Sequence, residues 1–469
     1  MENKVIGLFK NIGILTVSNF ASKILVFLMV PLYTSVLTTE EYGSYDLIIT
    51  TINLLYPIIT LNIIDSIMLF MMDKKIESMK VISIGTRYIL ISISVAFFII
   101  VFLVLGDFFP DVTQWGVYIF IYYTFTVINQ FLIQVAKGLE KVMTLGIAGV
   151  FGTIAMIATI LIFLLVFKMG LKGFFIAAIL SQIIPTAYIF IKIKFWQLIQ
   201  FAGVEKKIES EMLKYSIPLI ATAVGWWFNS GSDKYVITFF YGMAANGLLS
   251  VAYKIPSILN TVQAVFIQAW QMTAVKEYGE ENAKIFYGRA FRVINLMMCI
   301  VASFLILLTK PLAYLLYSND FYSAWKFVPF LLVSSVLNCA SGFLGPILGG
   351  KRDSKSMALS AIYGSIINIV FNILLVNIMG PQGVTIATAI ASAIIFYIRL
   401  RAVGDEIVIS GYIWVVLTWI LLVIESLIEI NTSYWYIECL IVLLILILNE
   451  DCATDIFKRC KSIINKKGY

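Results

Sequence analysis

Long apolar segments alternate with short polar segments along the whole chain. A helix that crosses the hydrocarbon layer of a membrane needs about 20 apolar residues. Fourteen segments approach or exceed that length: 11–37, 45–72, 84–105, 116–136, 143–167, 173–193, 214–241, 244–274, 287–309, 325–349, 357–379, 383–400, 408–428 and 434–449. The pattern predicts an all-α polytopic membrane protein with about 14 transmembrane helices.

The composition agrees with this prediction. The chain of 469 residues is 61% hydrophobic and 13% charged, whereas soluble domains are about half apolar and a quarter charged. The segment from Met1 to Lys10 leads straight into an apolar helix, without a cleavage site behind a short apolar core. We therefore expect no signal peptide and no independent soluble domain.

Residue types that support metal or acid–base chemistry are scarce. The absence of histidine removes the commonest metal ligand and the commonest general base. The five cysteines form no CxxC pair, which favours reduced, structural cysteines. The sequence therefore predicts no metal site, no cofactor and no catalytic residue.

Basic residues in the loops indicate the orientation in the membrane. With a cytoplasmic N-terminus, most of the 34 Lys and Arg residues fall in cytoplasmic segments. Those that fall in outer segments are Lys168, Lys172, Lys310 and Lys326. We expect both termini in the cytoplasm. The net charge of +7 is then a topology signal, and no soluble basic face remains for nucleic acid.

A short repeat divides the chain into two halves. Residues 169–178 align with 379–388, with Met, Gly, Gly, Ile and Ala identical, and Lys141 aligns with Lys351 at the same offset. The offset covers six predicted helices, so the halves share one orientation, a transporter design with the substrate between them. We expect the following parts: an N-lobe at 1–200, a C-lobe at 201–402, two helices at 403–449 and a basic cytoplasmic tail at 450–469.

Five charged residues within the predicted spans are candidates for function: Lys23, Lys234, Lys254, Asp65 and Asp233. Charge in hydrocarbon is costly and usually faces the bundle interior or a wet cavity. The lysines could pair with the aspartates across helices or extend to the interface. Alternatively, they line a cationic cavity that suits a phosphate head group, with the two aspartates as candidates for ion coupling. Asp233 and Lys234 point about 100° apart on a helix, so both cannot easily face one cargo.

Amide and aromatic side chains in the spans add polar surface to such a cavity. The candidates to contact a sugar are Asn19, Trp227, Gln268 and Trp270. Hydrogen bonding between helices is the alternative role for such residues. Glu425 lies near an outer helix end, where solvent could account for its charge.

Several motifs lie in equivalent parts of the two halves. The first half has Lys23-Ile24-Leu25, Pro31-Leu32-Tyr33-Thr34 and Thr39-Glu40-Glu41-Tyr42-Gly43-Ser44-Tyr45-Asp46-Leu47. The second half has Trp226-Trp227, Ser232-Asp233-Lys234-Tyr235, Asn246-Gly247, Ser250-Val251-Ala252-Tyr253-Lys254-Ile255-Pro256 and Phe266-Ile267-Gln268-Ala269-Trp270-Gln271. In these motifs the chain resembles the polysaccharide/oligosaccharide flippases (Wzx-type) of the multidrug/oligosaccharidyl-lipid/polysaccharide exporter superfamily. The likeness covers roughly residues 1–402.

The resemblance implies two MATE-like six-helix lobes that alternate access. Such proteins move undecaprenyl-diphosphate-linked oligosaccharide repeat units from the inner to the outer leaflet of the bacterial plasma membrane. Their cationic central cavity receives the pyrophosphate and the sugar while the lipid tail stays in the bilayer. The expected partners are this lipid-linked oligosaccharide, the bilayer, a polysaccharide polymerase and glycosyltransferases, with the flippase itself a monomer.

The alternatives are three other membrane functions. Lipid II flippases share the fold but tend to have arginine-rich cavities, whereas the bases within the spans here are all lysine. Drug or ion antiporters carry carboxylates for cationic substrates, and here lysines outnumber aspartates. A membrane glycosyltransferase or polymerase needs a positioned acid or base, yet the largest outer loop, 310–325, has Asp320 as its one carboxylate. An oligosaccharide-lipid flippase is the favoured function.

Overall fold

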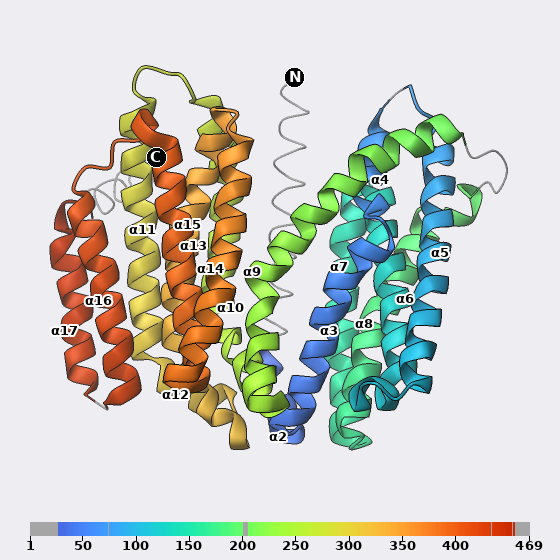
Figure 1. The fold of residues 1–469 in the computed structure, drawn as a ribbon, viewed down its shortest axis with the longest axis horizontal. Helices are drawn as coiled ribbons and strands as arrows, with labels where there is room; N and C mark the ends of the chain where they lie inside the picture. Colours follow the sequence, from blue (N-terminus) through green and yellow to red (C-terminus); the bar gives the residue numbers. More distant parts are fainter. Residues whose placement is uncertain (1–26, 74, 200–204, 433, 453, 455–469) are drawn as a thin grey trace, which may run out of the picture. The chain divides into compact units, whose positions relative to one another are not determined.

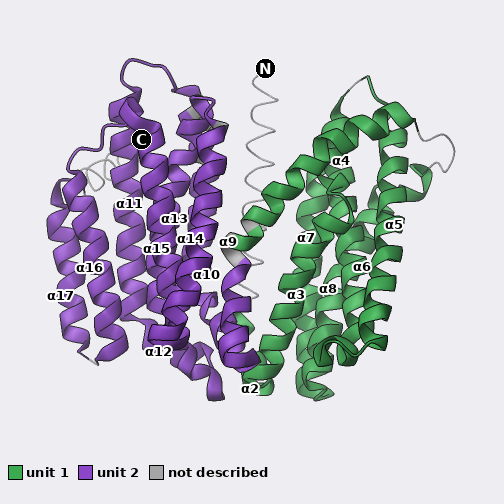
Figure 2. Ribbon diagram, viewed as in Figure 1, with its two compact units in different colours: residues 1–228 green, residues 229–469 purple. Residues whose placement is uncertain are grey.

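The structure is a computed structural model that describes residues 27–73, 75–199, 205–432, 434–452 and 454. The regular secondary structure of these residues is entirely helical (Figure 1). The predicted all-α class is confirmed. Two compact units, 1–228 and 229–469, are shown in Figure 2, and helix α9 continues from the first into the second.

Unit 1 is a set of helices joined by short turns. In chain order they are α2 (Val30–Val36), α3 (Thr39–Ile59), α4 (Ile63–Met72), α5 (Ser78–Leu105), α6 (Pro110–Gly138), α7 (Val142–Ile160), the π-helical turn η1 (Leu161–Val166), α8 (Gly170–Lys192), the short η2 (Phe195–Gln197) and the first part of α9 (Lys206–Ala252). Helix α6 packs against α4, α5 and α8, and α7 packs against α8. The apolar faces of α4 to α8 therefore cover one another within the unit.

The start of α3 explains the motif that runs from Thr39 to Leu47. The Thr38 hydroxyl accepts a hydrogen bond from the Glu41 backbone N–H at 3.1 Å, and the Glu41 carboxylate accepts one from the Thr38 N–H at 2.8 Å. This reciprocal capping box satisfies two backbone donors at the helix end. The next residue, Tyr42, stacks on Tyr33 of α2 with ring centroids 5.0 Å apart. The motif thus begins a helix and fixes it to its neighbour.

The predicted span 45–72 is interrupted in the structure. Helices α3 and α4 meet at an angle of 56°. The residues at the break, Leu61 and Asn62, both have φ of 51°, in the left-handed region that ends a right-handed helix. Pro57 removes a backbone donor just before the break. Apolar length alone predicts a continuous span here because it does not register backbone conformation.

Unit 2 contains the remaining helices. They are the end of α9, α10 (Lys254–Lys276), α11 (Ala283–Leu307), α12 (Thr309–Leu316), η3 (Asn319–Phe327), α13 (Val328–Gly350), α14 (Ser354–Met379), η4 (Gly380–Gln382), α15 (Gly383–Val403), η5 (Gly404–Glu406), α16 (Tyr412–Asn431) and α17 (Trp435–Leu448). Helix α13 lies in the core, because it packs against α10, α11 and α15 and most of its residues are buried. Helix α9 breaks at Gly242, where φ is 80°. The predicted boundary between the seventh and eighth spans falls at this break.

Nine helical segments of the described residues are long and apolar enough to cross a membrane, or ten if the bent α3–α4 pair counts as one span. The predicted span 11–37 lies largely outside the described residues. Helices α14 and α15 pass this test together, as Lys355–Glu406, and α17 is shorter, with 14 residues. Helix α10 has the length of a span, but its many amides keep it out of the set. The chain is therefore a multi-pass membrane protein.

The repeat has a glycine with a positive φ at the equivalent position of each unit. Gly170 and Gly380 each adopt a positive φ, 54° and 69°, which a residue with a side chain rarely adopts. Three residues later, a Cβ on Gly173 would lie 3.1 Å from the Phe163 carbonyl oxygen, and one on Gly383 would overlap the Leu375 carbonyl. Each pair of glycines therefore makes a tight turn against the preceding helix. We keep the lobes at 1–200 and 201–402 as a proposal from this repeat.

Helix α14 begins at a cap that lies outside the apolar segments. The backbone N–H and the hydroxyl of Ser356 donate to the Asp353 carboxylate at 3.0 and 2.7 Å. These hydrogen bonds hold the pKa of Asp353 below its usual range. Nearby, the Lys351 ammonium donates to the Ala402 carbonyl at 2.8 Å. The predicted basic turn is thus fixed to the end of α15.

Candidate functional site

A buried carboxylate joins three helices of unit 2. Asp233 of α9 is 1% exposed. One of its oxygens, Oδ2, accepts hydrogen bonds from the Tyr253 hydroxyl at 2.9 Å and the Thr388 hydroxyl at 2.7 Å. The other, Oδ1, accepts one from the Asn372 amide at 2.6 Å. Hydrogen bonds to both oxygens stabilise a carboxylate, so Asp233 has donors that can hold a buried charge.

Further polar groups extend this cluster along α14. The Asn368 Oδ1 atom accepts hydrogen bonds from the Ser232 hydroxyl and the Asn372 amide, both at 3.0 Å. Within the described part of the chain, the buried Asn372 Oδ1 atom has no hydrogen-bond donor. The Asp233 cluster, meaning Ser232, Asp233, Tyr253, Asn368, Asn372 and Thr388, therefore gathers carboxylate, amide and hydroxyl oxygens. Hard cations prefer oxygen ligands of this kind.

Two lysines lie next to residues of the Asp233 cluster. Lys234 follows Asp233, Lys254 follows Tyr253, and both lysines are half-buried. Successive residues of a helix point about 100° apart, so the inward direction of Asp233 turns Lys234 away from the Asp233 cluster. Of the two neighbours, Asp233 contacts α14 and α15, and Lys234 is the one with exposed surface.

The predicted sugar-contacting residues have different environments. Gln268 is exposed on α10. Trp270 is buried, with its ring stacked 4.1 Å from that of Phe343 and its indole N–H donating to the Phe343 carbonyl at 2.8 Å. In unit 1, the Trp227 indole donates to the Thr50 carbonyl at 2.8 Å. Trp270 therefore belongs to the core of unit 2, because both its face and its N–H are already used.

Asp65 does not belong to a buried site. It lies exposed in the first turn of α4 and accepts a hydrogen bond from the Asn62 amide at 3.0 Å. A carboxylate at this end of a helix also interacts favourably with the helix dipole. The local role of Asp65 is thus to stabilise the break between α3 and α4. Two other candidates, Lys23 and Asn19, lie outside the described residues.

Arginine is also present within a span, contrary to the expectation that lysine is the only base there. Arg399 lies within α15, in the apolar segment Lys355–Glu406. Its guanidinium donates to the Ser360 hydroxyl and the Ser341 carbonyl, both at 3.0 Å. It therefore links α13, α14 and α15. The sequence counts Arg399 among the cytoplasmic bases because it lies next to the end of the predicted span 383–400, whereas the helix continues to Val403.

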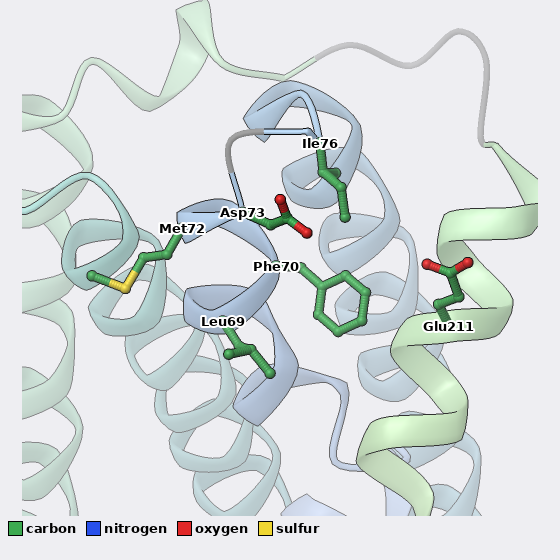
Figure 3. Close-up of a pocket in the computed structure, with 6 residues that line it drawn as sticks. All are labelled: Leu69, Phe70, Met72, Asp73, Ile76 and Glu211. Carbon is green, nitrogen blue, oxygen red and sulfur yellow. The ribbon is translucent and has the colours of Figure 1, made fainter.

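A cavity of about 450 Å³ lies in unit 1 between α4 and α9. Figure 3 shows its lining, with the Phe70 ring between Asp73 and Glu211. The other lining residues are Leu69, Met72 and Ile76. Two carboxylates and an apolar wall do not suit an anionic head group. None of the residues predicted to bind substrate lines this cavity.

Sequence reasoning missed most of the Asp233 cluster. Asn368 and Asn372 are both amides within the predicted span 357–379, whereas Thr388 is a common hydroxyl residue in the next span. The available signal is spacing, since Asn368 and Asn372 are four residues apart and share one face of α14. The hydrogen bond from Asn372 to Asp233 joins positions 139 residues apart, which a single sequence does not pair.

The chain is similar to known proteins in sequence and in fold. The family described as "Polysaccharide biosynthesis protein" matches residues 8–271, more than half of the chain. Among curated proteins, none matches. A solved structure titled as the lipid II flippase MurJ in an inward closed conformation is 16% identical, with a TM-score of 0.71, covering 94% of this chain and 99% of that one.

Transporters of the multidrug resistance MATE family are similar as well. An inward-facing structure from the MOP superfamily is 15% identical, with a TM-score of 0.63, and covers 87% of this chain and 95% of its own. An outward-facing structure is 16% identical, with a TM-score of 0.56 and coverages of 88% and 96%. These neighbours are transporters and flippases rather than enzymes. The chain belongs to the polysaccharide biosynthesis protein family and has the fold of the MOP superfamily.

Proposed function

We propose that the protein is a flippase that moves undecaprenyl-diphosphate-linked oligosaccharide units across the bacterial plasma membrane by alternating access. The observation that carries the proposal is the pair of half-buried lysines, Lys234 and Lys254, in the part of the chain that matches the family. Ammonium groups bind phosphate oxygens through charge-assisted hydrogen bonds. A pyrophosphate head group suits such a pair, whereas a cationic drug does not.

The membrane potential is the driving force in this proposal. We retain the orientation with both termini in the cytoplasm. An inside-negative potential favours outward movement of an anion by about 2.3 kcal/mol per charge per 100 mV. Export of a diphosphate-linked cargo is then favourable without an additional substrate.

The Asp233 cluster is the proposed site of ion coupling, in addition to the potential. Its carboxylate, amide and hydroxyl oxygens suit a small hard cation such as sodium, and the unpaired Asn372 Oδ1 atom supports this assignment. Asp65 is a weaker candidate for coupling, because it is exposed and already accepts a hydrogen bond from Asn62.

The sugar contacts proposed for the cargo are Gln268, which is exposed on α10, and Trp227, whose ring is half-buried. Lys23 and Asn19 keep their proposed roles in substrate binding. Trp270 is kept only as a residue that positions α10, because it is part of the core. A polymerase and glycosyltransferases are the proposed functional partners, and the flippase is proposed to act as a monomer.

The test is transport in proteoliposomes that contain a lipid-linked oligosaccharide and an external enzyme that modifies only outer-leaflet sugar. The Lys234→Ala, Lys254→Ala double variant should lower the initial rate at least tenfold at matched protein content. Lys276→Ala, an exposed lysine at the end of α10, is the matched control and should transport normally. Normal transport by the double variant would contradict the cationic binding site.

The same assay separates the competing functions. Transport of lipid II in preference to the oligosaccharide-lipid would identify a lipid II flippase. Lengthening of the glycan would identify a polymerase. Replacing sodium with choline tests the coupling proposal. The transport rate of the wild type should fall in choline, whereas the transport rate of Asp233→Asn should be the same in sodium and in choline.

A further inference from the structure

A second group of buried carboxyls lies where α16 and α17 pack against α11. Glu425 and Glu429 are one turn apart on α16, and Glu438 lies in the first turn of α17. They are 0%, 4% and 1% exposed. Solvent therefore does not account for Glu425, and the expectation from its place near a helix end is wrong. The helix end is covered by the neighbouring helices.

The hydrogen-bond donors near these carboxyls are already used. The Lys310 ammonium donates to the Glu429 carboxylate at 3.2 Å, to the Glu429 carbonyl at 2.9 Å and to the Thr432 carbonyl at 2.8 Å. An ammonium group has three N–H donors, so Lys310 has none left. The Ser303 hydroxyl has one donor and gives it to Glu425 Oε2 at 2.7 Å.

Several carboxyl oxygens consequently lack a donor. Among the described residues, no hydrogen-bond partner reaches Glu425 Oε1, Glu429 Oε1 or either oxygen of Glu438. The side chains of Glu429 and Glu438 nevertheless lie within hydrogen-bonding reach of each other. Two carboxyl groups can share a hydrogen bond only when one of them carries a proton.

The charges lead to the same conclusion. Three ionised carboxylates beside one ammonium would leave two uncompensated negative charges in a buried site, which is costly. The electrostatic partners of the three carboxyls are one another and Lys310. The described residues of α13, which also packs on α16, contribute no such partner. Two protons would make the cluster neutral.

A metal ion is a poorer occupant than protons. The described residues contain no group of three or more His, Cys, Asp or Glu side chains arranged to hold a metal ion. The carboxyls are instead distributed along one face of α16 and across to α17. Carboxyls in this arrangement can each take a proton without converging on one point.

We propose that Glu425, Glu429 and Glu438, with Lys310, form a proton-binding site that holds two protons, one shared by Glu429 and Glu438 and one on Glu425. The site lies apart from the Asp233 cluster and does not depend on which substrate the protein moves. Loss of these protons would place like charges at neighbouring positions between α16, α17 and α11. Protonation thus links the last two helices to the rest of unit 2.

Infrared spectroscopy of the full-length protein in lipid nanodiscs tests the proposal. A protonated carboxyl has a C=O band distinct from that of a carboxylate. At neutral pH the wild type should show this band, and the band should shift in D₂O. Glu438→Gln and Glu425→Gln should each reduce the band about twofold, because each removes one of two protons. The double variant should abolish it.

The control is Glu281→Gln, an exposed acid in the turn before α11, which should leave the band unchanged. A wild-type spectrum without the band at neutral pH would overturn the proposal, and this measurement needs no variant to fold. A band that persists in the double variant would also overturn it. A band that falls when sodium replaces choline at constant pH would identify a cation site instead.

Discussion

Unit 2 contains two buried carboxylate sites with opposite hydrogen-bonding environments. Asp233 accepts hydrogen bonds from Tyr253, Asn372 and Thr388, whereas Glu438 has no donor among the described residues. Both side chains are almost completely covered, at 1% exposure. Burial alone therefore does not determine what a carboxyl group does in this protein. The donors around it determine whether it holds a charge or needs a proton.

The comparison predicts that an apolar replacement has opposite effects at the two sites. Asp233→Leu should destabilise the protein by about 3 kcal/mol or more, because three buried donors lose their acceptor. Thermal unfolding in detergent measures this effect, with Asp405→Asn, an exposed acid, as the control. An unchanged midpoint would show that these hydrogen bonds do not support the fold.

Removing the one cation of the second site should have an intermediate effect. Lys310→Met leaves Glu429 without its partner and should cost about 2 kcal/mol, less than a fully buried pair, because Lys310 is partly exposed. Adding Glu429→Gln should restore most of the loss. A double-mutant cycle on the unfolding midpoint measures the coupling, and additive losses would show that the two residues act independently.

The smallest expected effect has the opposite sign. Glu438→Met replaces a carboxyl that reaches no partner among the described residues except the carboxyl of Glu429, which keeps Lys310, so stability should stay the same or rise by about 1 kcal/mol. The same unfolding assay measures it, with Glu281→Met as the surface control. A loss comparable to that of Asp233→Leu would mean that Glu438 has donors after all and that the two sites are alike.

The sequence predicts the helices well because the cost of exposing backbone in hydrocarbon makes every span a long apolar helix. It also predicts the break at Gly242, because two apolar runs that are each long enough to span the membrane meet there. It does not predict the bend at Leu61 and Asn62, since left-handed backbone at those residue types depends on the packing of α3 and α4. Apolar runs also end before helices do, which is why Arg399, next to the end of the predicted span 383–400, is counted among the cytoplasmic bases.

The candidate site is predicted less completely. The cost of burying charge in a membrane identifies Asp233 and Lys234 as unusual. Only the contacts from α14 and α15 show that Asp233 is the fully buried residue and Lys234 the half-buried one. The same limit applies to Trp270. From the sequence, its amphipathic ring could pack in a core or contact a sugar, and only its contacts with Phe343 assign it to the core. For Glu425 the sequence suggests exposure to solvent, and the structure shows a buried side chain. The position of a residue along a helix does not show which neighbouring helices cover it.

The repeated glycine turn has a consequence for engineering the protein. A residue with a side chain at Gly383 would collide with the backbone of Leu375, whereas one at Gly173 meets the Phe163 carbonyl at 3.1 Å, a tight contact that requires a shift of a few tenths of an ångström. The two halves thus share the glycine pair but differ in how much space surrounds it. A saturation library would lose nearly every variant at position 383 and retain some alanine at 173, so insertions and labels are better placed in the first half of the repeat than in the second.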